Sequence, residues 1–275
     1  MSVSRKDWRV LALLAPATFI IVAPFLWLIT SSLKTEAEIG ASNPFALPNK
    51  LMWQNYADAW KIGGFADLIG NSLMNVAGVV LLLLLVCVPA GYVLAKMRFP
   101  GREWVFYGFI FGLTIPINAI IIPLYQVLTG LGLIDSLTGV VLAQVSNGAP
   151  FGIFLMRSFF VSVPGELSEA AKVDGANHFQ ILTRVFLPLS MPAVQALVII
   201  SALSTWNDFF LPLVVLISPD VQTLPLGLVR FVSTNVTSYH LVFSGTVITF
   251  LPVIVLFVLM QRRFTEGLTQ GALKG

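Results

Sequence analysis

Residues 68–95 read LIGNSLMNVAGVVLLLLLVCVPAGYVLA, and this stretch decides the class of fold. It contains no Asp, Glu, Lys or Arg. An α-helix rises about 1.5 Å per residue, so roughly 20 apolar residues cross the roughly 30 Å hydrocarbon core of a bilayer. The stretch is therefore long enough to span a membrane as a single helix.

Five further uncharged stretches lie on either side of it. The chain is 57% hydrophobic and only 11% charged, whereas a soluble protein carries roughly 25% charged residues. We therefore expect an all-α integral membrane protein with one transmembrane domain over residues 1–275. Its six transmembrane helices are expected at roughly residues 11–32, 69–95, 104–127, 137–157, 187–208 and 241–261.

The basic residues indicate the orientation of the chain. With a cytoplasmic N-terminus, the internal segments hold twelve of the 16 Lys and Arg, and the external segments hold only Lys34, Lys50, Lys61 and Arg230. Cytoplasmic loops are enriched in Lys and Arg. We expect both termini in the cytoplasm and a multi-pass protein of a bacterial or archaeal cytoplasmic membrane.

The first apolar stretch resembles a signal peptide, because it follows Arg5, Lys6 and Arg9 and contains Ala15-Pro16-Ala17 as a nominal cleavage site. The apolar run continues past that point, and five more stretches follow. We therefore interpret it as a retained helix.

The sequence lacks the residue patterns that several other functions require. The basic residues form no stripe interleaved with aromatics, so nucleic-acid binding is not expected. Cys87 is the only cysteine, and His178 and His240 lie far apart, so neither a disulfide framework nor a metal site is expected. No GxxxxGK[ST] stretch occurs, so any ATP and Mg²⁺ must be bound by a partner.

Polar residues inside the spans are candidates for a substrate pathway. Amides there can hydrogen-bond a substrate in a cavity, or can equally join helices to one another. Asp208 follows the fifth stretch directly, and an ionisable group at membrane depth usually faces a cavity or a partner. It could also cap the helix at the outer interface. The candidates are Asn71, Asn75, Gln144, Asn147, Trp206, Asn207 and Asp208.

The loop over residues 162–186, between the fourth and fifth spans, is too long and too patterned for a simple connector. Ser162, Pro164 and Glu166 are typical of a helix start, and Gly175 interrupts the pattern after Asp174. Two short helices meeting at Gly175 would project a knuckle into the cytoplasm. A solvated amphipathic loop is the alternative.

The loop resembles the EAA loop of ABC importer permeases. That pattern reads EAA, three residues, G, nine residues, I, one residue and LP. Here Glu169-Ala170-Ala171, Gly175 and Leu187-Pro188 match its spacing, with Val185 in the place of isoleucine. The resemblance implies a coupling helix that docks on an ATPase subunit, with Asp174 available to pair with basic groups.

Two further segments resemble a narrower group, the carbohydrate permeases of maltose, multiple-sugar and glycerol-3-phosphate type. Residues 206–209 (Trp-Asn-Asp-Phe) resemble its WN[DE]F stretch. The C-terminus, QRRFTEGLTQGALKG over residues 261–275, resembles the RxFxxGLTxGAxKG ending of the second permease. In that ending, Gly267, Gly271 and Lys274 would contact a partner, or the segment is a flexible tail.

The resemblance implies a transporter subunit that catalyses no covalent reaction and carries no cofactor. It would form half of a carbohydrate pathway with a second homologous permease. A dimer of ATPase subunits would dock below, and an extracytoplasmic sugar-binding protein would deliver substrate.

Other classes of protein stay as alternatives. An ion-driven secondary transporter would show repeat symmetry and buried carboxylates. A membrane-bound enzyme or a purely structural scaffold is a second rival. The enzyme would need clustered His, Asp or Glu on facing spans, and the spans are almost empty of them. Within the importers, an amino-acid or phosphate permease is a further alternative.

Overall fold

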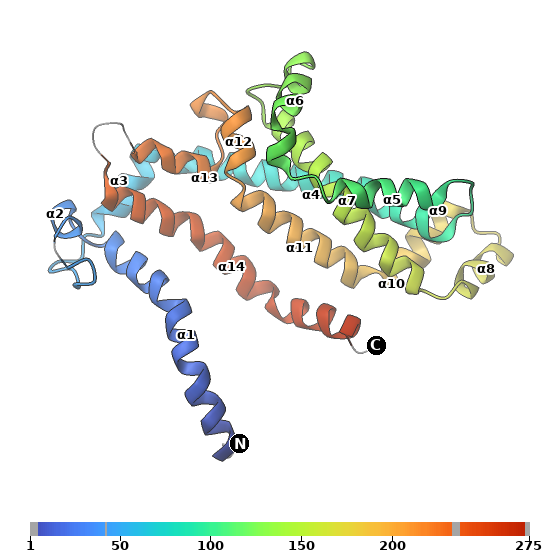
Figure 1. Ribbon diagram of the computed structural model, residues 1–275, viewed down its shortest axis with the longest axis horizontal. Coiled ribbons are helices and arrows are strands. Elements are labelled where there is room, and N and C mark those ends of the chain that lie inside the picture. Colours follow the sequence, from blue (N-terminus) through green and yellow to red (C-terminus); the bar gives the residue numbers. More distant parts are fainter. Residues whose placement is uncertain (1–4, 42, 233–236, 273–275) are drawn as a thin grey trace. The chain divides into compact units, whose positions relative to one another are not determined.

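The computed structural model describes residues 5–41, 43–232 and 237–272, and the side chains of residues 14–41, 43–232 and 237–255. The regular secondary structure of this part of the chain is helical, apart from a single β-bridge between Val232 and Thr237 (Figure 1). The longer helices are α1 (Arg5–Ser32), α3 (Gln54–Gly63), α4 (Phe65–Lys96), α5 (Arg102–Gly112), α6 (Ile117–Gly130), α7 (Leu137–Ser162), α11 (Met191–Asn207) and α14 (Tyr239–Ala272).

The shorter elements connect these helices. They are α2 (Glu36–Ile39), α8 (Glu166–Val173), α9 (His178–Ile181), the π-helix Leu182–Phe186, α10 (Leu187–Leu189), α12 (Phe210–Val215), the 3₁₀ turns Pro219–Val221 and Leu228–Phe231, and α13 (Leu224–Gly227). A π-helix carries one more residue per turn than an α-helix, and it is uncommon outside functional segments.

Among the described residues, three helices are long and apolar enough to cross a membrane, namely Leu14–Ser32, Phe65–Lys96 and Leu137–Ser162. Counting each of two bent helix pairs as one span gives up to five. The apolar helix Tyr239–Val255 is shorter. The described helices therefore supply up to five candidate spans, one fewer than the six expected from the sequence.

The structure differs from the expectation at two spans. The stretch 104–127 forms α5 and α6, which meet at 103°, rather than one helix. Pro116 is extended, with φ −68° and ψ 136°, and a proline disfavours helical backbone at the preceding residue. The stretch 187–208 is also divided, because α10 ends at Leu189 and α11 begins at Met191 after a bend of 78°.

The chain divides into two compact units, and residues 67–226 form the larger part of one of them. Its core is built from α4, α7 and α11, with Cys87, Ile153 and Leu197 at its centre. A Cβ at Gly152 would lie 2.5 Å from Cys87 Sγ, so only glycine permits this approach of α7 to α4. Lipid supplies no hydrophobic drive between helices, so such close packing supplies the stability.

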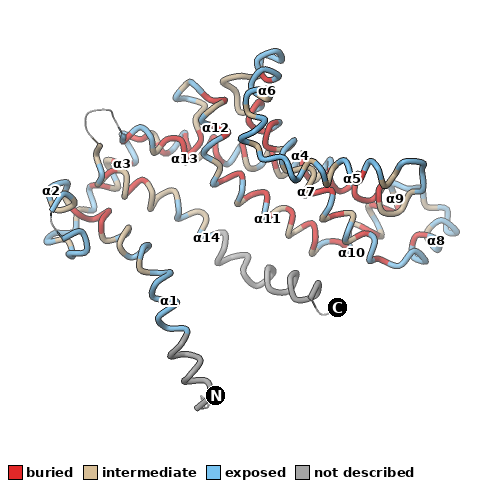
Figure 2. The backbone as a smooth tube through the Cα atoms, in the orientation of Figure 1, coloured by how far each residue is buried: buried red, intermediate tan, exposed pale blue. Residues whose placement is uncertain are grey.

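The other unit consists of residues 1–66 and 227–254. The end of α1 lies at its centre, where the Ser32 carbonyl accepts hydrogen bonds from Asn55 Nδ2 and Ser244 Oγ. Phe65 is fully buried and stacks with Phe231. Figure 2 shows the contrast along α1, whose residues with described side chains are mostly exposed until the last two, Ser31 and Ser32, are buried.

Candidate functional site

The segment between α7 and α11 forms two short helices on either side of Gly175. The helix α8 ends in a Schellman motif, in which the Ala176 N–H donates to the Ala171 carbonyl and the Gly175 N–H donates to the Lys172 carbonyl. Gly175 adopts φ +81°, which an L-residue rarely adopts. The EAA and glycine positions therefore act together, because the glycine ends the helix to which the alanines belong.

The tip of this segment is exposed. Glu169, Ala170 and Asp174 are all on the surface, whereas Ala171 packs against the chain's own core. Val173 is 88% exposed and Phe179 is 73% exposed. The sequence analysis did not select these two residues as candidates. A valine and a phenylalanine in an otherwise polar loop were the signal that could have identified them. Ser162 does not start α8, because α7 continues through it.

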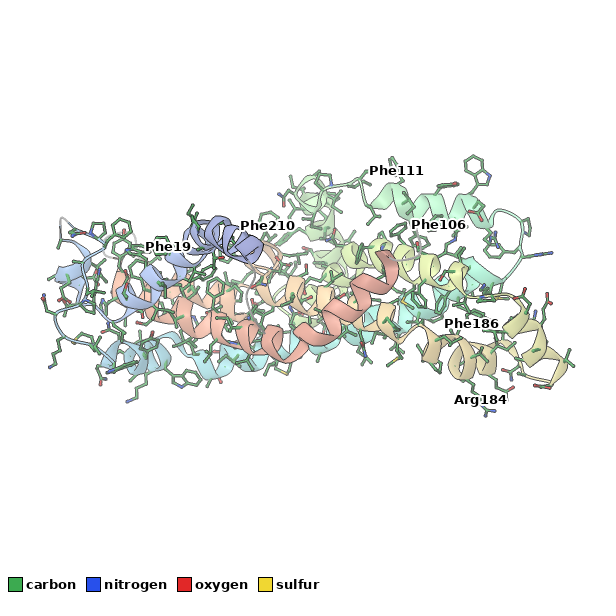
Figure 3. All side chains as sticks on the ribbon, turned by 90° about the horizontal axis from the view of Figure 1, so that it is seen from below. Phe19, Phe106, Phe111, Arg184, Phe186 and Phe210 are labelled. Atoms are coloured by element: carbon green, nitrogen blue, oxygen red, sulfur yellow. The ribbon has the colours of Figure 1, made fainter. Side chains whose placement is uncertain are left out.

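The base of the segment is fixed by aromatic packing. The Phe186 ring is fully buried, 5.3 Å from Tyr92 on α4 and 5.9 Å from Phe160 on α7 between centroids. In Figure 3 Arg184 projects from this segment, whereas Phe186 lies among neighbouring side chains. The Tyr92 hydroxyl also contacts His178 Nδ1 at 3.2 Å. The base of the segment is thus packed against α4 and α7.

Leu187 and Pro188 follow directly in α10, where Leu187 is half-buried and Pro188 is exposed. They do not end the preceding helical segment, because the π-helix continues into α10. The bend follows at Ser190, whose hydroxyl donates to the Leu187 carbonyl at 3.1 Å.

A cavity of about 740 Å³ lies among α4, α6, α7, α11 and α12. Four of the predicted pathway residues line it, namely Gln144, Asn147, Asn207 and Asp208. Asn118, Ser201, Ser204 and Thr205 also line it and were not singled out from the sequence, because isolated hydroxyls and amides carry no spacing signal. Carboxamides, hydroxyls and one carboxylate therefore share this cavity.

A chain of hydrogen bonds leads from the cavity into the core. Asn75 Nδ2 donates to Gln144 Oε1 at 3.0 Å, and Gln144 Nε2 donates to Asp208 Oδ2 at 2.7 Å. Asp208 Oδ1 accepts from the Leu211 N–H at 3.3 Å, so this carboxylate also joins the end of α11 to α12. Asp208 thus lines the cavity, and its carboxylate accepts from the first turn of α12 rather than capping the end of α11.

The remaining predicted residues lie elsewhere. Asn71 Nδ2 donates to the carbonyls of Asp220 at 2.7 Å and Gln222 at 3.0 Å, which ties α4 to the 3₁₀ turn Pro219–Val221 and the loop after it. Trp206 is buried and does not line the cavity. Gly267 and Gly271 lie in the last turns of α14, and Lys274 lies outside the described residues.

The comparison with protein families gives one match. The model of the family "Binding-protein-dependent transport system inner membrane component" matches residues 87–270. These residues include the loop around Gly175, Asp208 and most of the cavity lining.

Curated relatives match over nearly the whole chain. The diacetylchitobiose uptake system permease protein NgcG of Streptomyces coelicolor is 34% identical and is aligned over 96% of this chain and 87% of its own. The arabinooligosaccharides transport system permease protein AraQ of Halalkalibacterium halodurans is also 34% identical, over 98% of this chain and 97% of its own.

A solved structure has the same fold. It is a chain of a bacterial ABC transporter involved in the import of the acidic polysaccharide alginate, with a TM-score of 0.82 and 26% sequence identity. The match covers 96% of this chain and 99% of that chain. This chain therefore belongs to the family of binding-protein-dependent transport system inner membrane components, and it is a permease subunit of an ABC importer.

Proposed function

We propose that this chain forms half of the translocation pathway for an uncharged oligosaccharide. In this proposal it has six spans, with each bent pair as one span and α14 as the last. It pairs with a second homologous permease, docks on a dimer of ATPase subunits that bind ATP and Mg²⁺, and receives sugar from an extracytoplasmic binding protein.

The observation that carries the substrate class is the lining of the cavity. Its polar groups are amides, hydroxyls and the Asp208 carboxylate, and no Lys, Arg or His occurs among the described residues that line it. Amides and hydroxyls both donate and accept hydrogen bonds, as sugar hydroxyls require. A lone carboxylate without a cation disfavours an anionic substrate, because like charges repel.

The names of the relatives point the same way. NgcG and AraQ are named for the uptake of diacetylchitobiose and arabinooligosaccharides. Their names support a carbohydrate as the substrate of this chain. The alginate importer takes an acidic polysaccharide. Its similarity to this chain supports a carbohydrate substrate here, but we do not extend the acidic charge of alginate to that substrate. The cavity chemistry favours a neutral sugar.

The coupling residues of the proposal are Glu169, Ala170, Ala171, Asp174, Gly175, Leu187 and Pro188. Closure of the ATPase dimer would move the exposed tip with Val173 and Phe179. Because Phe186 packs on Tyr92 and Phe160, the movement would reach α4 and α7, which line the cavity. A rigid movement of this kind converts ATP binding into alternating access, because each ligand favours one of two states.

Copurification with the genomic neighbours of this chain tests the assembly. The wild type should recover an ATPase and a second permease in mild detergent, and a Glu169→Arg, Gly175→Pro double variant should lose the ATPase alone. Recovery of this chain only with itself would overturn the assembly.

Uptake into proteoliposomes tests the substrate class. The complex should take up a neutral labelled oligosaccharide, whereas a uronic-acid oligosaccharide of the same length should not compete. Equal competition by the acidic sugar would overturn the proposed selectivity and leave the permease assignment intact.

A further inference from the structure

The short helix α3 has two different faces. Asn55, Ala59 and Gly63 are buried against their own unit, and they recur at the spacing of one helix face. Trp53, Ala57 and Trp60 lie on the opposite face and are exposed. We call these three residues the tryptophan face. We expect lipid or a protein partner to cover this outward apolar face, because large apolar patches are uncommon on surfaces exposed to water.

The start of α3 is fixed to the end of the first span. Asn55 Nδ2 donates to the carbonyls of Ser32 at 2.9 Å and Lys34 at 2.8 Å, and the Tyr56 hydroxyl contacts Ser32 Oγ at 2.6 Å. Ser32 is the last residue of α1 and of its candidate span. The first turn of α3 is therefore attached to the end of the candidate span in α1.

The end of α3 leads directly into the next span. Gly64 adopts φ +67° and turns the chain, and α4 begins at Phe65. Trp60 stacks on Phe65, with 6.3 Å between centroids and 21° between planes. Both ends of α3 are therefore tied to the ends of candidate spans.

The chemistry of the exposed face fits the boundary between hydrocarbon and water. Trp53 is 65% exposed and Trp60 is 43% exposed, and neither indole N–H has a hydrogen-bond partner among the described residues. Tryptophan concentrates at membrane interfaces, where its ring meets acyl chains and its N–H meets headgroups. Lys50 and Lys61 are exposed nearby, and their ammonium groups can reach lipid phosphates.

The span that precedes α3 also exposes apolar side chains. Phe25, Leu26 and Ile29 on α1 are about half exposed, at 48%, 51% and 45%. We propose that α3 lies in the headgroup region of the bilayer, with the tryptophan face bound to phospholipid, as an interfacial anchor between the first two spans. The helix α2, in contrast, carries the acidic residues Glu36 and Glu38 and no tryptophan.

A fluorescent label at Ala57→Cys tests the proposal in the complete importer reconstituted in phosphatidylcholine–phosphatidylglycerol nanodiscs. Cys87 is fully buried, and wild-type protein treated in the same way gives the background. Ala37→Cys on α2 is the matched control, because Ala37 is also an exposed alanine on a short external helix.

Lipids spin-labelled at the headgroup or at a shallow acyl carbon should quench the label at position 57 at least threefold more than the label at position 37. Aqueous iodide should show the reverse order. Trp53→Gln with Trp60→Gln should reduce the lipid quenching at position 57 at least twofold. Lipid quenching at position 57 equal to that at position 37 would overturn the proposal. A fluorescence change at position 57 that occurs only when sugar-loaded binding protein is added would also overturn it.

Discussion

The Gln144 Nε2 atom donates a hydrogen bond to Asp208 Oδ2 over 2.7 Å, and this contact joins α7 to the end of α11 at the cavity. A carboxylate only accepts, so it fixes the orientation of the Gln144 amide, whose Oε1 then accepts from Asn75. Asn75 Oδ1 is left without a partner within the described part of the chain. One charge at the cavity thus orders two amides behind it.

The first prediction concerns this charge. Asp208→Asn should weaken the bond to Gln144 and lower the free energy of unfolding by about 1–2 kcal/mol, because charge-assisted hydrogen bonds are the stronger ones. The measurement is the thermal midpoint of the purified complex in detergent. Uptake in proteoliposomes should also show a higher KM for sugar.

The control for this variant is Asn147→Ala. Asn147 lines the same cavity, but it is exposed and has no hydrogen bond to another described residue. Uptake should fall while the thermal midpoint stays at the wild-type value. A stability loss for Asn147→Ala as large as that for Asp208→Asn would contradict the role given to the Gln144–Asp208 bond.

The second prediction concerns the backbone at Gly175. A Cβ there would meet nothing within 4 Å, so the cost of substitution comes only from φ +81°. Gly175→Ala should cost about 1–2 kcal/mol and Gly175→Val more, whereas Gly175→Asn should cost less because Asn tolerates this conformation. The readout is the ATPase recovered with the permease and the ATP hydrolysis stimulated by binding protein.

Gly165→Ala is the matched control for that series. Gly165 precedes α8 and has φ −67°, and a Cβ at this position would also meet nothing within 4 Å. The substitution should leave ATPase recovery unchanged. Equal loss for Gly165→Ala and Gly175→Ala would show that crowding at the ATPase surface, rather than backbone strain, determines the effect.

The third prediction compares two neighbours in the π-helix. Phe186→Ala removes a fully buried ring and should destabilise the complex by about 3–5 kcal/mol, since a cavity forms between α4 and α7. Phe186→Leu should cost less and keep part of the coupling. Arg184→Ala, at an exposed position, should leave the thermal midpoint unchanged. Normal ATP-dependent uptake by Phe186→Ala would exclude the aromatic route of coupling.

The fourth prediction concerns pH. The Ser218 hydroxyl, the Ser218 N–H and the Ile217 N–H all donate to the Asp135 carboxylate and hold its pKa below the ordinary 3.8. Because the folded pKa is lowered, the stabilisation is present above the unfolded value of 3.8 and is lost as pH falls through the folded value.

Asp135→Asn tests this pH dependence without changing the backbone requirement, because Asp135 has φ +58° and Asn also tolerates that region. The thermal midpoint of the variant should lie below that of the wild type at pH 7. The difference should shrink when the pH falls below about 4, where the carboxylate begins to take up a proton. A difference that stays constant between pH 7 and about pH 3 would assign the effect to something other than the carboxylate charge.

The sequence was sufficient for the class of fold and for the two short helices on either side of Gly175, because both depend on local pattern. Residues 68–95 form part of the single helix α4, and Gly175 lies between two short helices, where the spacing placed it. The family could also be recognised from the sequence, because Glu169-Ala170-Ala171 and Leu187-Pro188 are separated by the spacing of the family motif. These features require no knowledge of which helices are neighbours.

The cavity and the bends depend on tertiary contacts that the sequence does not contain. Asn71 and Gln144 are both amides within spans, yet one binds backbone carbonyls and the other faces a cavity. The uncharged run from 104 to 134 concealed the break before Pro116, because apolar residues continue through it. The exposure of Val173 and Phe179 likewise follows from the turn at Gly175 and not from composition.

The π-helix at Leu182–Phe186 sets the angle at which the knuckle points. Each residue in an α-helix advances the chain by roughly 100° around the axis, so one residue removed from the π-helix would relax it to an α-helix and turn everything before it by about that angle. The helices would survive, but Val173 and Phe179 would point to another side of the molecule. The direction of the knuckle and the stability of the segment can therefore change independently. The five-residue length of the π-helix determines the direction.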